Sequence, residues 1–166
     1  MSEVLCFGCG ALVPDQHGPV HKYMLSAPGC WATYGSVLAW HAGLPSADPA
    51  VSQHMADAYA AQHAANDDRR NRQSVAVHLM SLCAALEHRV SGTRLPQMIG
   101  SWTHRDYPQL VPRPGAYPIT IREVADVTGN SRPALIDDWA ASTWAAWSAH
   151  HITVRTWLAA AAGLGT

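Results

Sequence analysis

The sequence predicts an all-α, four-helix-bundle-like domain with an irregular N-terminal metal-binding loop and a long Pro-rich connection. Two patterns predict this fold. In residues 75–86 the apolar positions recur at i, i+3, i+4, i+7 and i+11, as on one face of a helix. Glycine and proline are instead concentrated in the first 28 residues, which indicates an irregular segment. With 166 residues, 48% of them hydrophobic, the chain suits a single domain with its own core.

Three helices are expected in residues 29–92. The first begins near Pro28, because proline is tolerated in a first turn, and ends at Gly43. The second follows Asp48 as N-cap, with Pro49 behind it, and continues through an Ala-rich stretch to about residue 65. The third covers about residues 70–90, because Val75, His78, Leu79, Leu82 and Leu86 form one amphipathic stripe.

The remaining regions are a Pro-rich loop, residues 93–118, and C-terminal helices in residues 119–166. A connection of this length is too long for a plain linker, so we expect it to cover a face of the domain. A short helix should begin after Thr120, with Glu123 completing a capping box. The last helix is expected from about residue 134 to 162, where Trp144, Trp147, His151, Val154 and Leu158 repeat with helical spacing.

Charge and hydropathy exclude several classes of protein. The formal net charge is −1, from 11 basic and 12 acidic residues without a basic stripe, which argues against a nucleic-acid partner. No apolar run approaches the ~20 residues that cross a bilayer, and residues 1–6 do not resemble a secretion signal. We therefore expect a cytoplasmic protein with no membrane partner, in which four cysteines act as metal ligands or free thiols.

The N-terminal loop carries the strongest chemical signal. Cys6 and Cys9 form a C-x-x-C-G turn, a spacing at which two thiolates bind one Zn²⁺. His17 and His21 follow, but their spacing from the cysteines is too short for a ββα zinc finger. The alternatives are a pair of thiols without a chemical role and a redox dithiol, and the absence of a βαβ pattern disfavours the redox dithiol.

Cys30 lies where the first helix begins, and the positive end of the helix dipole stabilises a thiolate there. This position suits a metal ligand, and equally a nucleophile with His21 as its base. A small buried side chain is the structural alternative. Cys83, one position off the apolar stripe of the third helix, is expected in the core.

Three histidines fall on apolar lines of three different helices: His63, His78 and His151. Each could be a hydrogen-bonded core residue, but together they could converge as metal sites do inside helical bundles. Tyr59 and Asp57 are candidates to assist them, Asp57 by orienting a ligand. These five residues are the candidate catalytic groups.

Two arrangements of a Zn²⁺ site follow from these residues. In the first, Cys6, Cys9, His21 and Cys30 close a four-ligand structural site, and the inner histidines form a separate polar pocket. In the second, the cysteine loop shares a site with His63, His78 or His151, leaving an open position for a metal-activated water. We expect the first, because closing a short loop costs less entropy.

Several segments together resemble an uncharacterised bacterial domain-of-unknown-function family: "CFGCG", "GPVHKYM", "GCWATYG", "DAYAAQH", "QSVAVHL" and "WAASTWAAWSAHH". The resemblance spans nearly the whole chain and implies a small soluble bacterial protein. Cys6, Cys9, His21, Cys30, His63, His78 and His151 lie inside these segments, whereas His17 lies outside them, which favours His21 over His17 as a ligand.

Three functional hypotheses remain from the sequence. The protein could be a zinc-dependent hydrolase or transferase acting on a small-molecule ligand. It could instead be a non-catalytic, metal-stabilised binding or regulatory module. The third hypothesis is a thiol enzyme in which Cys30 is the nucleophile and His21 the base.

Overall fold

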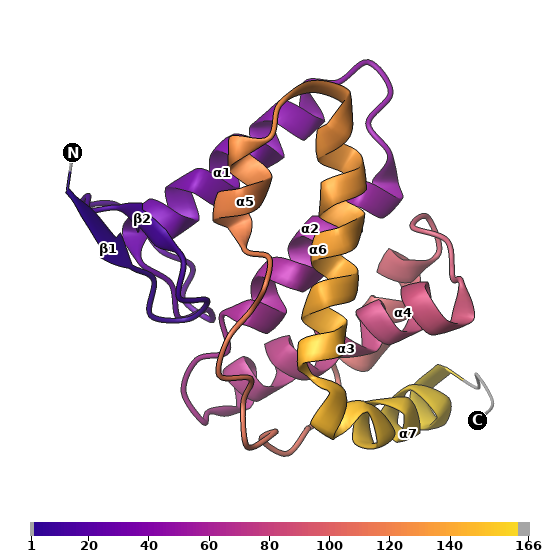
Figure 1. The fold of residues 1–166 in the computed structure, drawn as a ribbon. Helices are drawn as coiled ribbons and strands as arrows, with labels where there is room; N and C mark the ends of the chain where they lie inside the picture. The colour runs from indigo at the N-terminus through magenta and orange to yellow at the C-terminus, as the bar shows by residue number, and fades with distance from the viewer. Residues whose placement is uncertain (1, 163–166) are drawn as a thin grey trace.

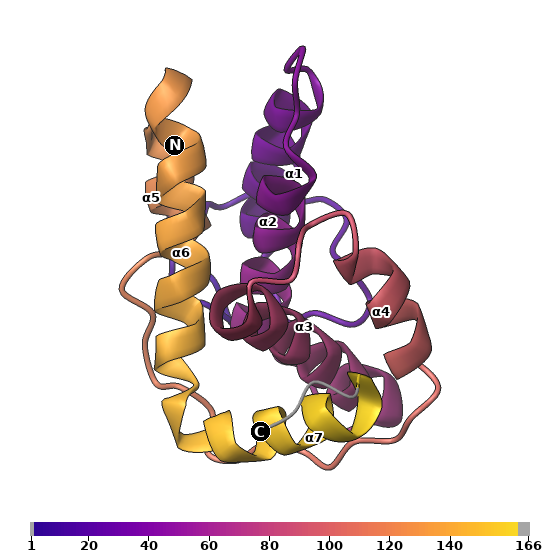
Figure 2. The same ribbon diagram turned by 90° about the vertical axis from the view of Figure 1, so that its right-hand side faces the viewer.

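A computed structural model describes residues 2–162, which contain seven α-helices and one two-stranded sheet (Figures 1 and 2). The predicted predominantly α-helical fold is confirmed. In chain order the elements are β1 (Glu3–Leu5), β2 (Leu12–Pro14), α1 (Pro28–Ala42), α2 (Pro49–Gln62), α3 (Arg69–His88), α4 (Leu95–Trp102), α5 (Ile121–Asp126), α6 (Arg132–Ala146) and α7 (His151–Ala162), with 3₁₀ turns at Gly129–Ser131 and Ser148–His150.

The helix starts follow local capping signals. The Asp48 carboxylate accepts a hydrogen bond from the amide of Ala50, and the Asp68 carboxylate caps α3. At α5 the complete capping box predicted from Thr120 and Glu123 is present. Helix α1 begins at Pro28 and is followed by Gly43, as predicted. Short-range hydrogen bonds from the capping side chains therefore mark where α2, α3 and α5 begin, whereas α1 begins at a proline without a side-chain cap.

The helices enclose two clusters of buried side chains. Helices α2 and α6 lie side by side, and α5 packs against α1 (Figure 1). Between them and the hairpin lies the hairpin-side core, which includes Met55, Ile121 and Trp139. Helix α3 crosses the lower ends of α2 and α6 and carries α4 and α7 (Figure 1). A second cluster there, the α3-side core, includes Leu82 and Trp102.

Two parts of the chain are more regular than expected. Residues 3–14 form an antiparallel hairpin, in which Val4 pairs with Val13, within the segment predicted to be irregular. The Pro-rich segment contains helix α4, which has a proline in its first turn and ends at the buried Trp102. Proline is compatible with a first turn, so its presence did not exclude a helix there.

The prediction of a single C-terminal helix over residues 134–162 is wrong, because this part of the chain forms two helices, α6 and α7. The backbone turns at residues 148–150, where the His150 imidazole makes a 2.7 Å hydrogen bond to the Pro112 carbonyl. The His151 ring stacks on Trp144, with centroids 3.8 Å apart, and its Nε2 lies 2.8 Å from the Trp144 carbonyl oxygen. That bond satisfies a carbonyl at the end of α6, so the helix can stop without a glycine.

Glu87 links helices α3, α6 and α7 through hydrogen bonds. Its carboxylate on α3 accepts two 2.8 Å hydrogen bonds from Arg155 on α7 and one of 3.0 Å from the Trp144 indole on α6. The hydrogen bonds from Arg155, reinforced by that from Trp144, lower the pKa of Glu87 to about 2. The ionised form therefore contributes stability above the ordinary glutamate pKa, and this contribution is lost as the pH falls towards about 2.

We expect Glu87→Gln to destabilise the protein by about 1–2 kcal/mol at pH 7, a value reduced for the partial exposure of the pair. Between about pH 5 and pH 2 the difference from wild type should shrink, because wild-type Glu87 becomes protonated in that range. Urea unfolding of both proteins across these pH values measures the difference. A difference that stays constant with pH would contradict this role of the carboxylate.

Within residues 2–162, no helix combines the length and the apolar character needed to cross a bilayer.

Candidate metal centre

Four buried donor side chains meet where the hairpin contacts α1 and α2. Cys6 and Cys9 lie on the turn between β1 and β2, Cys30 lies in the first turn of α1, and His63 follows the last residue of α2. Their Sγ and ring nitrogen atoms all lie within 4.8 Å of one another. Each residue is at most 5% exposed. The group could hold a metal ion.

Three of the six separations between the donor atoms are close to the edges of a tetrahedron, and the other three are within 4.8 Å. Zinc lies about 2.3 Å from sulfur and about 2.0 Å from nitrogen, so tetrahedral edges are about 3.8 Å for S···S and about 3.5 Å for S···N. In the structure His63 Nε2 lies 3.4 Å from Cys6 Sγ and 3.3 Å from Cys30 Sγ. Cys9 Sγ lies 3.9 Å from Cys30 Sγ. A disulfide requires about 2.05 Å, so these are free thiols at ligand spacing.

The turn that carries Cys6 and Cys9 depends on two glycines. Gly10 has φ +75°, a conformation that glycine adopts without steric cost. A Cβ at Gly8 would lie 2.3 Å from the Leu25 carbonyl oxygen and 2.7 Å from Cδ2 of His63. The turn therefore approaches both the following segment and the imidazole more closely than any larger residue would allow. The Ala27 amide adds a 3.4 Å hydrogen bond to Cys6 Sγ.

His63 is oriented by its own helix. Its Nδ1–H donates to the Tyr59 carbonyl at 2.6 Å, which leaves the Nε2 lone pair directed at the sulfurs. The Tyr59 ring stacks on the imidazole with centroids 3.9 Å apart, and its hydroxyl donates to Cys30 Sγ at 3.5 Å. The His63 carbonyl in turn accepts the Leu25 amide at 2.9 Å. Ring position and tautomer are both those of a metal ligand.

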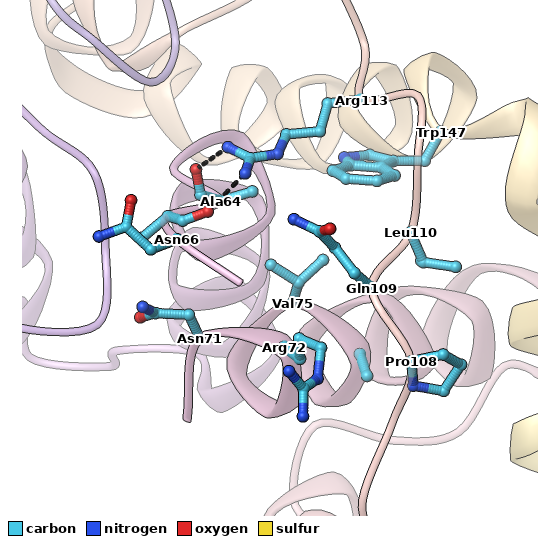
Figure 3. Close-up of a pocket in the computed structure, with 12 residues that line it drawn as sticks. Ala64, Asn66, Asn71, Arg72, Val75, Pro108, Gln109, Leu110, Arg113 and Trp147 are labelled. Carbon is cyan, nitrogen blue, oxygen red and sulfur yellow. Dashed lines mark hydrogen bonds between the residues drawn. The ribbon is translucent and has the colours of Figure 1, made fainter. Parts of the chain in front are cut away.

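The chain after His63 is held by Arg113. Its guanidinium donates to the Ala64 and Ala65 carbonyls at 2.6 and 2.5 Å, as Figure 3 shows. The same close-up shows a pocket between this loop, α3 and the Pro-rich segment, with Val75, Leu110 and Trp147 on its walls. Part of the Pro-rich segment thus fixes the backbone beside the fourth donor.

The pKa values of the three thiols are shifted in different directions. Hydrogen bonds from Cys30 and Cys9, together with His63, lower the pKa of Cys6. The hydrogen bond to Cys6 raises the pKa of Cys30, with burial adding to the effect. Hydrogen bonding with Cys30 lowers the pKa of Cys9, but Cys6 and burial outweigh this and raise it to about 12. Three neighbouring thiolates repel one another, and a divalent cation would remove that repulsion.

The structure places the predicted ligands in part as expected. Cys6, Cys9 and Cys30 lie together, but the fourth donor is His63 and not His21. The His21 ring instead packs between Tyr23 and Trp31, with centroids 5.5 Å from each, and its Nδ1 accepts the Tyr23 amide at 3.2 Å. The cysteine loop therefore shares its site with an inner histidine, as in the second of the two arrangements, but with four protein donors.

The other inner histidines do not converge with His63. His78 Nδ1 lies 2.8 Å from Asp57 Oδ1, and His151 stacks on Trp144 near the α6–α7 turn. Asp57 therefore contacts His78 and not the four buried donors, whereas Tyr59 contacts both His63 and Cys30. Cys30 is fully buried and its imidazole neighbour is His63, so His21 is not placed as a base for it.

The sequence carried one signal for His63. It follows Tyr59 by four residues and Met55 by eight, on a helical face whose other members are fully buried. That spacing predicts an inward imidazole, but it does not say that the hairpin folds onto the end of α2. The partner of His63 is set by a contact across 57 residues of chain.

Comparison with known proteins assigns the chain to a family of unknown function. The model of a family described as "Family of unknown function (DUF5946)" matches residues 4–148, a range that includes all four donors. Searches of the curated proteins and of the solved structures return no match.

Proposed function

The chain belongs to this family of unknown function, and from its geometry we propose that it is a zinc-stabilised binding module whose Cys₃His centre is structural. The ion would fasten the N-terminal hairpin to α1 and α2. One observation carries this proposal: four buried protein donors from three separate segments lie within 4.8 Å of one another, and three of their separations fit a tetrahedral site.

The number of protein donors favours a structural role over metal catalysis. Catalytic zinc sites have three protein ligands and keep a fourth position for water, whereas structural sites are closed by four. Here all four positions are supplied by the chain, and the donors are buried. A zinc-dependent hydrolase or transferase would need an open position that this geometry does not provide.

The donor types favour zinc among the common metals. Thiolate and imidazole in a tetrahedral arrangement suit Zn²⁺, whereas Mg²⁺ and Ca²⁺ prefer oxygen ligands. The cluster contains no carboxylate. Three thiolates and one neutral imidazole around Zn²⁺ leave a net charge of −1, which the hydrogen bonds from Ala27 and Tyr59 to two of the sulfurs partly offset.

A pair of histidine variants tests the ligand set. We expect protein purified without chelators to contain one zinc per chain, His21→Ala to retain it, and His63→Ala to lose most of it, because only His63 faces the sulfurs. Elemental analysis measures the content, and cobalt substitution reports tetrahedral thiolate ligation through its intense visible bands. Metal loss in His21→Ala with retention in His63→Ala would contradict the proposal.

A third variant separates ligand loss from misfolding. His63→Cys supplies a sulfur donor from the same position, and four-cysteine sites are common for structural zinc. It should bind zinc more completely than His63→Ala, with an altered cobalt spectrum. Wild-type protein that is folded and free of metal would overturn the proposed function.

A further inference from the structure

A second cluster of functional groups surrounds a buried carboxylate on α2. Asp57 is fully buried, and its two oxygens accept three hydrogen bonds. Oδ1 accepts from Gln53 at 2.8 Å and from His78 Nδ1 at 2.8 Å, while Oδ2 accepts from the Ser81 hydroxyl at 2.6 Å. An ionised carboxylate only accepts, so the proton of a neutral His78 must lie on Nδ1.

This tautomer leaves the lone pair of His78 on Nε2. Within residues 2–162, Nε2 of His78 makes no hydrogen bond to the protein. His78 lines a pocket of about 190 Å³ between α3, α4 and the segment before α1. Ser74, one turn earlier on the same face of α3, Thr103 and Tyr23 also line the pocket with residues that carry hydroxyl groups. This volume is smaller than the about 300–1,000 Å³ of drug-sized ligand sites, so the pocket suits a ligand of only a few non-hydrogen atoms.

The side chains that line the pocket include one permanent positive charge and no carboxylate. Arg70 lines it and forms no ion pair within the described residues, and none of the lining residues is acidic. The charged or titratable groups around His78 include Asp57 behind it on α2, Arg70 on its own helix, and Tyr23 and His21 on the N-terminal segment. Burial, and then the charges of His78 and Lys22, lower the pKa of His21. The lining residues from α4 are uncharged.

We propose that this pocket binds a small carboxylate- or phosphate-bearing molecule and that His78 accepts a proton from a hydroxyl or water held beside it. Arg70 holds the anionic group. Asp57 is a positioning residue that fixes the tautomer of His78 and stabilises the imidazolium that forms, as buried carboxylates do beside catalytic histidines. The O–H bond breaks, its electron pair stays on oxygen, and the proton forms a bond to Nε2 of His78. Nε2 later returns this proton to a leaving group or to solvent.

The pocket is connected to the metal centre through one short segment. Tyr23 lies two residues before Leu25, whose amide binds the carbonyl of the zinc ligand His63. The chemistry proposed for the His78 pocket does not use the metal, so the pocket would exist even if the ion were other than zinc. Its binding function extends the proposed metal-stabilised module by naming what such a module binds.

Inorganic phosphate is the probe for the anion site. In zinc-loaded protein, NMR signals of the His78 ring should shift and saturate as phosphate is added. Arg70→Gln should weaken this binding at least tenfold, whereas Arg69→Gln, which removes the neighbouring charge outside the pocket, should bind as wild type. Equal binding by both variants, or no saturable shift in wild type, would overturn the proposal. Unchanged zinc content shows that the variants are folded.

Hydrolysis of 4-nitrophenyl acetate tests proton acceptance. Water attacks the acetyl carbon while its proton passes to Nε2, and the C–O bond to 4-nitrophenolate breaks. We expect His78→Gln to lower the protein-dependent rate at least fivefold, and phosphate to inhibit wild type but not Arg70→Gln. Asp57→Asn should lower the rate and also redistribute the His78 tautomers in ¹⁵N spectra. A His78→Gln rate equal to wild type would refute the role of His78.

Discussion

Replacing Cys30 by serine should remove the metal ion and lower the free energy of unfolding by more than about 4 kcal/mol, the range of losses caused by removing a metal site. For a chain of this size the melting temperature should fall by roughly 8–16 °C. The physical reason is that Cys30 contacts His63 and Cys9 at ligand spacing, so one sulfur lost leaves two thiols and a histidine buried without their ion. Calorimetry with parallel zinc analysis measures both effects.

Cys83→Ser is the matched control. Cys83 is also a fully buried helical cysteine, but it lies on α3, where its thiol donates to Glu87 at 3.7 Å. A serine hydroxyl can make the same donation, so we expect a cost of about 1 kcal/mol and full retention of zinc. If the two substitutions destabilise the protein equally, the effect at Cys30 comes from burying a hydroxyl and not from the metal.

Gly29→Ala should destabilise the protein by about 3 kcal/mol, the upper end of the usual overpacking cost. A Cβ at Gly29 would lie 2.0 Å from the Pro14 carbonyl oxygen and 3.0 Å from its carbon, both backbone atoms that no rotamer change can move aside. The start of α1 must then separate from β2, and Cys30, the next residue, moves with it. Chemical denaturation should show the loss of stability, and competition with a chelator should show weaker zinc binding.

Gly35→Ala, in the same helix, should stabilise the protein, in contrast to Gly29→Ala. A Cβ there has no heavy atom within 4 Å, so the substitution only restricts the unfolded chain and should stabilise by about 0.5–1 kcal/mol. Destabilisation by both alanines would show that α1 tolerates no added side chain anywhere. In that case the effect at Gly29 could not be assigned to the hairpin contact.

The parts of the fold that depend on nearby residues were predicted from the sequence. Asp48 and Thr120, the two caps predicted, accept hydrogen bonds from amides two residues away, so their signals are visible in the chain itself. The end of α6 was not visible in this way. Its stripe of buried residues continues past the turn, and the hydrogen bond from His150 to Pro112 spans 38 residues.

In the candidate site, too, the features set by nearby residues could be predicted and those set by distant contacts could not. The three cysteines could be selected from spacing and position, because two lie on one turn and the third at a helix start. The choice between His21 and His63 could not be made from loop length. Closing a short loop costs less entropy, but Tyr23 and Trp31 pack around His21, whereas the Tyr59 carbonyl holds His63 in the orientation that faces the sulfurs.

The order of the ligands along the chain has a consequence for biosynthesis. Because all four donors precede Ala64, the site is complete in sequence before any residue of α3 has been translated. Domains tend to fold from the N-terminus during synthesis, so metal capture can organise the hairpin and the first two helices on the ribosome. The later helices would then be added to a nascent chain whose leading end is already cross-linked, and the supply of zinc at that moment would govern the yield of native protein.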